Sequence, residues 1–182
     1  MFPITAERPA DAAQIETLLD LTFGSDRAKK TVYRLREGVA HLRPLAFVVR
    51  EQDIRASGGR LLGSIRYWPV GLGEAQSPAI MLGPVAVHPD YQGQGIGRAL
   101  IRHSLYAATR LGHRICILVG DKPYYEPFGF TSAADRGLEM PGWVERERFQ
   151  VMELLPGALD GVAGMVGKPL RSASPRGRRR AA

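Results

Sequence analysis

Residues 82–101 read LGPVAVHPDYQGQGIGRALI, and this stretch decides the fold. Its early part, residues 85–87, is short, apolar and rich in β-branched side chains, which predicts a buried strand. Glycines follow at every second position, at Gly93, Gly95 and Gly97. They allow the backbone to turn tightly and to approach a ligand closely. The helix predicted next offers free amide groups and the positive end of its dipole, so the stretch predicts an anion site suited to a diphosphate.

The spacing of these glycines excludes two common phosphate-binding motifs. A P-loop requires Lys followed by Ser or Thr after its last glycine, whereas Arg98 and Ala99 follow Gly97 here. A dinucleotide fingerprint requires G-x-G-x-x-G, and its third glycine would fall on Arg98 or on Leu100. The pattern that does fit is Q-x-x-G-x-G, which begins at Gln92.

Two sequence blocks resemble the GCN5-related N-acetyltransferase (GNAT) family. The Q-x-x-G-x-G pattern, within residues 85–97, resembles the family's acetyl-coenzyme A signature almost position by position. The segment YYEPFGF, residues 124–130, resembles the family's later motif, a short helix that carries a tyrosine and is followed by a strand. The two blocks stand in the family's order, with a helix and a strand predicted between them.

The resemblance implies a fold and an activity. The fold is α/β, with a mixed, mainly antiparallel sheet whose central parallel strands splay apart, flanked by helices. The activity is transfer of an acetyl group from acetyl-CoA to a primary amine by direct attack. The cofactor's pantetheine arm would enter the gap between the splayed strands and pair with exposed backbone, like an added strand. The cofactor-binding residues implied are Val85, Ala86, Val87, Gln92, Gly93, Gln94, Gly95, Ile96, Gly97 and Arg98.

The dipeptide Gly83-Pro84 supplies a local cause for such a gap. Proline has no amide hydrogen to donate to a neighbouring strand, and glycine tolerates a bulge. A strand interrupted in this way cannot pair continuously, so a bulge is predicted here. The alternative interpretation is an ordinary proline in an edge strand.

The resemblance also indicates a proton donor. Tyr125 aligns with the tyrosine that the family often uses as general acid toward the departing sulfur. A phenol with a pKa of about 10 stays protonated at neutral pH and can donate. Tyr124 is the alternative, because a shift of one residue on a short helix exchanges their faces. Backbone amides of residues 85–87 would orient the thioester and stabilise the developing oxyanion.

The sequence is less informative about a general base. Many relatives place a glutamate on the bulged strand, whereas residues 80–83 are Ile, Met, Leu and Gly. Glu74, His88 and Glu126 remain candidates, although His88 is favoured as structural, and an amine of low pKa would need no strong base. The asparagine often found before the motif tyrosine is also replaced, because residues 120–123 read GDKP.

Composition limits the class of protein. A chain of 182 residues predicts one domain, which we place over residues 1–167. No apolar run reaches the roughly 18 residues of a membrane span, and the N-terminus lacks the pattern of a signal peptide. The single cysteine, Cys116, lies in an apolar run and is expected to be a buried side chain. We therefore expect a cytoplasmic protein without a membrane partner, and, since no Cys/His cluster is present, without a metal.

The basic charge is concentrated at the C-terminus. The net charge is +7, and six positive charges follow Asp160 with no acidic residue among them, so the preceding residues carry only +1. Residues 168–182 are predicted to form a disordered tail. We expect this tail to be solvated, and this interpretation is favoured over electrostatic binding of the tail to nucleic acid. The expected partner is a small-molecule or peptide amine acceptor, whose identity is not readable from the sequence, and a homodimer stays open.

Three functional hypotheses follow. The first is the acetyltransferase. The second is a non-catalytic module that binds and senses acyl-CoA, which the missing strand glutamate motivates. The third is a nucleic-acid binder that acts through the arginine-rich tail.

Periodicity and turn residues predict the remaining elements. Asp11 is expected to cap a helix that buries its apolar side chains, and Gly112 to end the helix after the glycine loop. A hairpin turn is expected at residues 57–59, and a looser segment at residues 71–78. The side chains expected to face inward are Ile15, Leu18, Leu19 and Leu21 on the first helix, Val32 and Leu35 on the second, and Ile96, Leu100, Ala107 and Leu111 on the third. The expected strands cover residues 2–6, 45–49, 61–70, 79–87, 114–119 and 149–155, and the expected helices cover 11–21, 26–37 and 96–111.

Overall fold

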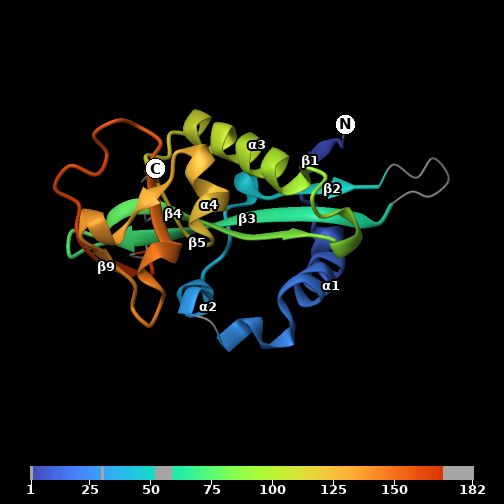
Figure 1. Ribbon diagram of the computed structural model, residues 1–182, viewed down its shortest axis with the longest axis horizontal. Helices are drawn as coiled ribbons and strands as arrows, with labels where there is room; N and C mark the ends of the chain where they lie inside the picture. The colour runs from blue at the N-terminus through green and yellow to red at the C-terminus, as the bar shows by residue number, and fades with distance from the viewer. Residues whose placement is uncertain (1, 30, 52–58, 170–182) are drawn as a thin grey trace, which may run out of the picture.

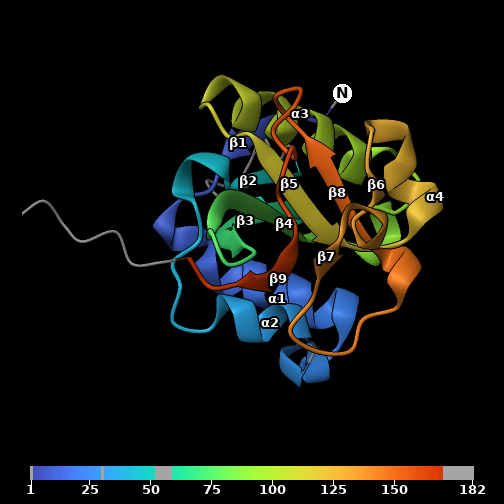
Figure 2. The ribbon, with the colours of Figure 1, turned by 90° about the vertical axis from the view of Figure 1, so that its left-hand side faces the viewer.

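The computed structural model describes residues 2–29, 31–51 and 59–169. A twisted sheet forms its middle layer, with α3 and α4 on one face and α1 and α2 on the other (Figures 1 and 2). The described helices are α1 (Ala12–Phe23), α2 (Thr31–Arg36), α3 (Ile96–Arg110) and α4 (Lys122–Tyr125). The described strands are β1 (Ile4–Ala6), β2 (Phe47–Arg50), β3 (Leu61–Leu72), β4 (Ser77–Val87), β5 (Ile115–Val119), β6 (Thr131–Ser132), β7 (Leu138–Glu139), β8 (Phe149–Glu153) and β9 (Gly164–Gly167).

The sheet is mixed and mainly antiparallel, as predicted. Its main path runs β1-β2-β3-β4-β5-β8-β6, and β9 pairs with β3 and with β7. The central strands β4 and β5 are parallel, and they are in register only at Ile80 with Cys116 and Met81 with Ile117. Beyond Met81 the two strands separate, which confirms the expected splay.

A bulge in β4 lies where the strands separate. On the β3 side, Val85 pairs with Ile65 and Leu82 pairs with Tyr67, so Gly83 and Pro84 together face a single residue of β3. The expected bulge is therefore confirmed. The alternative of an edge-strand proline is wrong, because β4 lies between β3 and β5.

The central strands are buried on both faces. Along β4, Ile80 and Leu82 pack in the cluster under α3, while Ala79 and Met81 pack in the cluster on the opposite face. This double burial explains why these strands are continuously apolar instead of alternating. The hydroxyl groups of Tyr67 and Ser104 are hydrogen-bonded at 2.9 Å, which joins β3 to α3 inside the core. Cys116 is fully buried, as expected.

Some of the side chains predicted to face inward on the helices are buried, and others are not. Ile96 and Leu100 of α3 are buried, but Leu111 is 54% exposed and Ala107 is only partly buried. Ala107 packs against the core under α3, as predicted. The prediction for Leu111 was wrong, because Leu111 follows the last residue of α3 and the final buried side chains of the helix are Leu105 and Ala108. Gly112 follows the helix with φ +81°, the left-handed conformation expected of a C-terminal glycine.

The N-terminal region shows similar corrections. Leu21 of α1 is 54% exposed, although Ile15, Leu18 and Leu19 are buried. Asp11 occupies the N-cap position, but its carboxylate caps no helical amide. It accepts the backbone N–H of Arg8 at 2.9 Å and pairs with Arg50 at 2.5 Å, since it is buried beside those cations. The predicted second helix is divided into a 3₁₀ segment, Ser25–Lys29, and α2, in which Leu35 is buried and Val32 partly so.

Several strand limits also differ from prediction. The antiparallel pairing of β2 with β3 confirms the hairpin, but Ser57 and Gly58 lie outside the described residues. The segment 71–78 is not loose, because Gly71 pairs with Pro78 on either side of a short turn. The short strand β6 follows the tyrosine motif, as the resemblance implied. The strands β7 and β9 were not predicted, since two to four residues are too few to show a period of two. Of the predicted tail, only Lys168 and Pro169 are described.

Candidate active site

A cavity of about 680 Å³ opens where β4 and β5 separate. One wall is the bulge, residues 82–85, and a second wall comes from residues 119–121 and the two tyrosines of α4. The third wall is α2, on the opposite side of the sheet from α3 (Figure 1). The cavity is thus bounded by the splayed strands and the tyrosine motif, two features that the sequence had linked.

The glycine loop leads directly into α3. Gly93 and Gly95 have φ values of +76° and +83°, a conformation that side chains with a Cβ rarely adopt. The first amide bonded within the helix is that of Ala99, which donates to the Gly95 carbonyl at 2.9 Å. The amides of residues 96–98 precede that bond and lie at the positive end of the helix dipole. Residues 92–95 are exposed, so this end of the helix is open to an anion.

Side chains of the loop hold its shape. Gln92 donates to the Val87 carbonyl at 3.2 Å, and Gln94 donates to the Asp90 carbonyl at 3.3 Å. His88 Nδ1 accepts the Asp90 amide at 3.3 Å, and the His88 ring also contacts Arg60. These contacts fit the structural role that was favoured for His88.

Tyr124 lies over the first turn of α3. A Cβ atom on Gly97 would come within 2.6 Å of the Tyr124 hydroxyl oxygen, so glycine is required there by close contact and not by its φ angle. The Arg98 guanidinium carbon is 5.8 Å from the centre of the Tyr124 ring. Burial raises the pKa of Tyr124, which keeps this hydroxyl protonated near the open helix end.

Tyr125 packs into the cavity wall beside β5. A Cβ on Gly120 would be 2.3 Å from Tyr125 Cε2, and the Tyr125 ring meets Phe130 edge-on with centroids 6.0 Å apart. Burial is the main cause that raises the pKa of Tyr125 far above its ordinary value. The phenol is therefore a neutral group able to donate a proton. Gly120 was missed as a site residue, although its place directly before the motif helix was the available signal.

A second hollow of about 600 Å³ adjoins the cavity and shares Tyr124, Asp121, Glu145 and Arg148 with it. Two further cationic side chains, Arg98 and Lys122, line this hollow. Lys122 and Arg148 were not predicted as site residues, because a surface lysine or arginine has no distinctive pattern. Three carboxylates, Asp121, Glu145 and Glu147, line the same hollow, so its cations and anions are equal in number.

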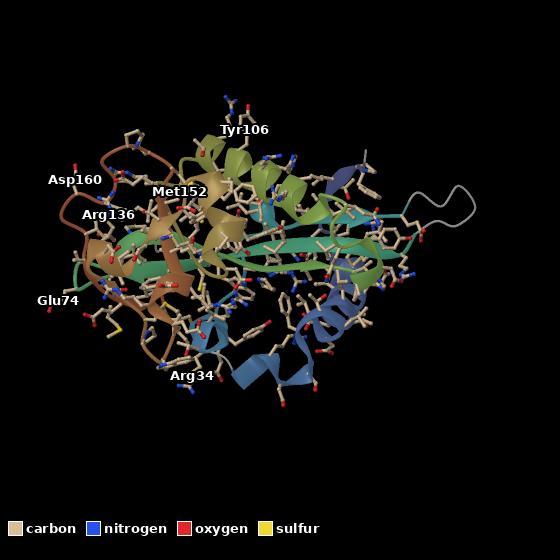
Figure 3. The ribbon with its side chains drawn as sticks, viewed as in Figure 1. Arg34, Glu74, Tyr106, Arg136, Met152 and Asp160 are labelled. Atoms are coloured by element: carbon tan, nitrogen blue, oxygen red, sulfur yellow. The ribbon has the colours of Figure 1, made fainter. Side chains whose placement is uncertain are left out.

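The predicted base candidates do not line either hollow. Glu74 lies in the β3–β4 turn, away from α2 (Figure 3), and His88 and Glu126 are likewise outside both linings. The carboxylates that do line the cavity are Asp121 and Glu145. Asp121 is paired with Arg148 at 3.3 Å. Sequence reasoning missed both, since they carry no motif of their own.

Two further observations concern the described residues only. None of their helices has the length and apolar character to cross a membrane. No three of their His, Cys, Asp or Glu side chains are grouped in a way that could hold a metal ion. The expectation that no metal is used stays a prediction.

Known proteins resemble this chain in sequence and fold. Residues 43–132 match the family model of the acetyltransferase (GNAT) domain. The uncharacterized N-acetyltransferase YhbS of Escherichia coli strain K12 is 32% identical over 163 residues, which are 90% of this chain and 93% of that protein.

Two crystal structures extend the comparison. YhbS from Escherichia coli in complex with CoA has a TM-score of 0.78 at 32% identity, covering 92% of this chain and 89% of that one. A GNAT family acetyltransferase from Brucella melitensis in complex with acetyl-CoA has a TM-score of 0.64 at 31% identity, covering 86% and 90%. The identity, the coverage and the splayed strands agree, and the chain belongs to the GNAT family of N-acetyltransferases.

Proposed function

We propose that this protein transfers the acetyl group of acetyl-CoA to a primary amine by direct attack of the amine on the thioester. The observation that carries the proposal is the position of one cavity, which touches the bulge of β4, the end of β5 and both motif tyrosines. The complexes of the two relatives with CoA and acetyl-CoA support the same donor.

The described residues fit acetyl-CoA along its length. Residues 85–87 pair with β3 on one side, while their other edge is free of β5. That free edge can bond the pantetheine arm as an added strand. The open amides of residues 96–98 and the Arg98 side chain suit the diphosphate. Acetyl-CoA, when bound, supplies the acetyl thioester next to Gly83 and Pro84.

The proposed roles of the side chains follow from their positions. Tyr125 protonates the departing sulfur, since its buried phenol keeps its proton at neutral pH. Tyr124 lies over Gly97, and we assign it to the phosphate end of the donor. Asp121 and Glu145 are the carboxylates of the cavity wall that can accept the proton of the amine. Amides of the bulged strand orient the thioester carbonyl.

A thiol-release assay with a panel of amines tests the proposal. Tyr125→Phe removes the proton donor and retains the ring, so we expect kcat to fall by a factor of about 10² to 10⁴. Binding of acetyl-CoA, measured by calorimetry, should change little. If acetyl-CoA binds but no amine is acetylated faster than by the Tyr125→Phe variant, the enzyme proposal fails.

That failure would favour the second candidate, a module that senses acyl-CoA without turnover. One observation speaks for it: residues 80–83 of β4 include no carboxylate. The presence of Asp121 and Glu145 across the same cavity favours the enzyme.

A further inference from the structure

Arg36, the last residue of α2, is a buried cation at the wall of the cavity. It is 8% exposed and lines the cavity together with the bulge. Its guanidinium carbon is 4.8 Å from the centre of the Tyr33 ring and 5.8 Å from that of the Trp68 ring. Arg36 therefore contacts two aromatic side chains on the α2 side of the sheet (Figure 1).

This cation has no carboxylate partner among the described residues. Two other arginines of the same cavity do: Arg27 pairs with Glu16 at 2.5 Å and with Asp20 at 3.2 Å, and Arg148 pairs with Asp121. In addition, Arg36 Nε is buried and has no hydrogen-bond partner in the described part of the chain. Burial lowers the pKa of Arg36 to about 10, because the aromatic contacts replace only part of the lost hydration.

A buried charge without an opposite charge is costly for a fold, and such charges are normally paired. The contacts of Arg36 with Tyr33 and Trp68 hold its position but do not neutralise it. The guanidinium is built to bind a carboxylate or a phosphate through two parallel hydrogen bonds. A ligand anion is thus the partner that this site lacks.

The position of Arg36 shows where on the ligand that anion would be. Its terminal nitrogen Nη2 is 3.4 Å from the place of a Cβ on Gly83. Gly83 belongs to the bulge, where the proposed reaction brings the amine to the thioester. The anionic group bound by Arg36 would therefore lie close to the attacking amine and not at a remote end of a long acceptor.

We propose that the acceptor is an amine that also carries an anionic group, a carboxylate or a phosphate, and that Arg36 binds this group. The inference rests on the proposed acetyl transfer and deepens it, since it names the class of acceptor. Arg36 acts as a binding residue that orients the amine. Arg34 of the same short helix also lines the cavity, but it is exposed and points away from the sheet (Figure 3), so it is not a buried cation beside the bulge as Arg36 is.

Matched acceptors test the proposal on the full chain. L-leucine is compared with L-leucinamide, and O-phosphoethanolamine with ethanolamine, so that each pair differs in the anion and the two pairs separate carboxylate from phosphate. We expect at least one anionic member to exceed its neutral partner in kcat/KM by about tenfold or more. Arg36→Gln should abolish this ratio mainly by raising KM.

Two variants serve as comparisons. Arg36→Lys keeps the charge but loses the paired geometry, so it should recover part of the preference. Arg110→Gln removes an exposed arginine of α3 outside both hollows, and it should leave the preference unchanged. Thermal melting of each variant checks that the fold is retained.

Binding without turnover provides a second measurement. N-acetylglycine, N-acetylglycinamide and inorganic phosphate are titrated by calorimetry into the CoA-saturated protein. We expect an anionic probe to bind about tenfold or more tightly than the amide, and only when Arg36 is present.

The outcomes separate the two proposals. Amines that are acetylated equally well with and without an anion, or an Arg36→Gln variant that lowers kcat alike for all amines, would overturn the role of Arg36 and leave acetyl transfer standing. Anionic probes that bind through Arg36 while no amine is acetylated would support the anion site and overturn acetyl transfer. Anionic probes that bind no better than the amide, together with equal turnover, would overturn the site.

Discussion

Gly97 and Tyr124 meet at the N-terminus of α3, where a Cβ on Gly97 would lie 2.6 Å from the Tyr124 hydroxyl oxygen. The two residues belong to different motifs, the glycine loop and the tyrosine motif. Their contact places the tyrosine hydroxyl beside the amides proposed to bind the diphosphate. One close contact therefore joins the glycine loop to the tyrosine motif.

Gly97→Ala should weaken the binding of acetyl-CoA. The added methyl group forces Tyr124 away from α3, while the helical φ of Gly97 itself tolerates alanine. We expect an increase of about tenfold in Kd, measured by calorimetry, equivalent to roughly 1.4 kcal/mol. The double variant Gly97→Ala/Tyr124→Phe removes the clashing oxygen and should recover more of the affinity than Tyr124→Phe loses alone. Without such recovery, the contact does not explain the effect.

Gly120→Ala should displace Tyr125. The new Cβ would be 2.3 Å from one ring carbon and 3.0 Å from another, so the ring must shift. Overpacking of this kind costs about 1–3 kcal/mol, which urea denaturation would measure as a lower free energy of unfolding. We also expect kcat to fall more than the affinity for acetyl-CoA. Since ring carbons cause the clash, Tyr125→Phe should not relieve it, and a rescue by that change would contradict the prediction.

The raised pKa of Tyr125 predicts a pH dependence of stability. The folded state holds this proton more tightly than the unfolded state, whose phenol titrates near its ordinary value of 10.0. The stabilising contribution is thus fully present below pH of about 10 and decreases as the pH rises further. The difference in free energy of unfolding between the wild type and Tyr125→Phe should be constant from pH 7 to 9. Above pH 9 the free energy of unfolding of the wild type should fall relative to that of the variant. If the two free energies instead change in parallel up to pH 11, the predicted link to the Tyr125 proton is wrong.

Arg36→Met should not lower the thermal stability. Burial depresses the pKa of Arg36, so its charge opposes folding at neutral pH, and this penalty decreases only as the pH rises above about 10. Methionine retains an apolar stem of similar length between Tyr33 and Trp68. We expect the melting temperature at pH 7 to be equal to or above that of the wild type. A marked decrease would indicate that the aromatic contacts of the cation dominate, as a purely structural role would require.

Local sequence determined the central elements of this fold. The apolar residues 85–87, the alternate glycines and the following helical pattern act over neighbouring residues, and the strand, loop and helix lie where they were predicted. Gly83-Pro84 likewise interrupts β4, because the missing amide hydrogen of a proline is a property of the residue itself. The family resemblance then identified the donor and the candidate proton donor, Tyr125, whose role stays a prediction.

Local sequence was misleading wherever burial depends on where an element ends. Leu21 and Leu111 fit apolar patterns, yet both are exposed, since Leu21 lies in the last turn of α1 and Leu111 follows the last residue of α3. Residues 71–78 have turn composition, yet the pairing of β3 with β4 keeps half of them in strands. Propensities are too weak to resist such tertiary pairing.

Only the tertiary structure decided the composition of the site. Arg36 and Gly83 are distant in the chain, as are Asp121 and Arg148 from the bulge, and no periodicity reports such contacts. Packing of α2 against the sheet leaves Arg36 buried without a carboxylate partner in the described part of the chain, and the splay of β4 from β5 opens the cavity beside it. The sequence by itself thus predicted the donor end, since most residues proposed to bind acetyl-CoA lie in one continuous segment. The acceptor end depends on residues that come together only on folding.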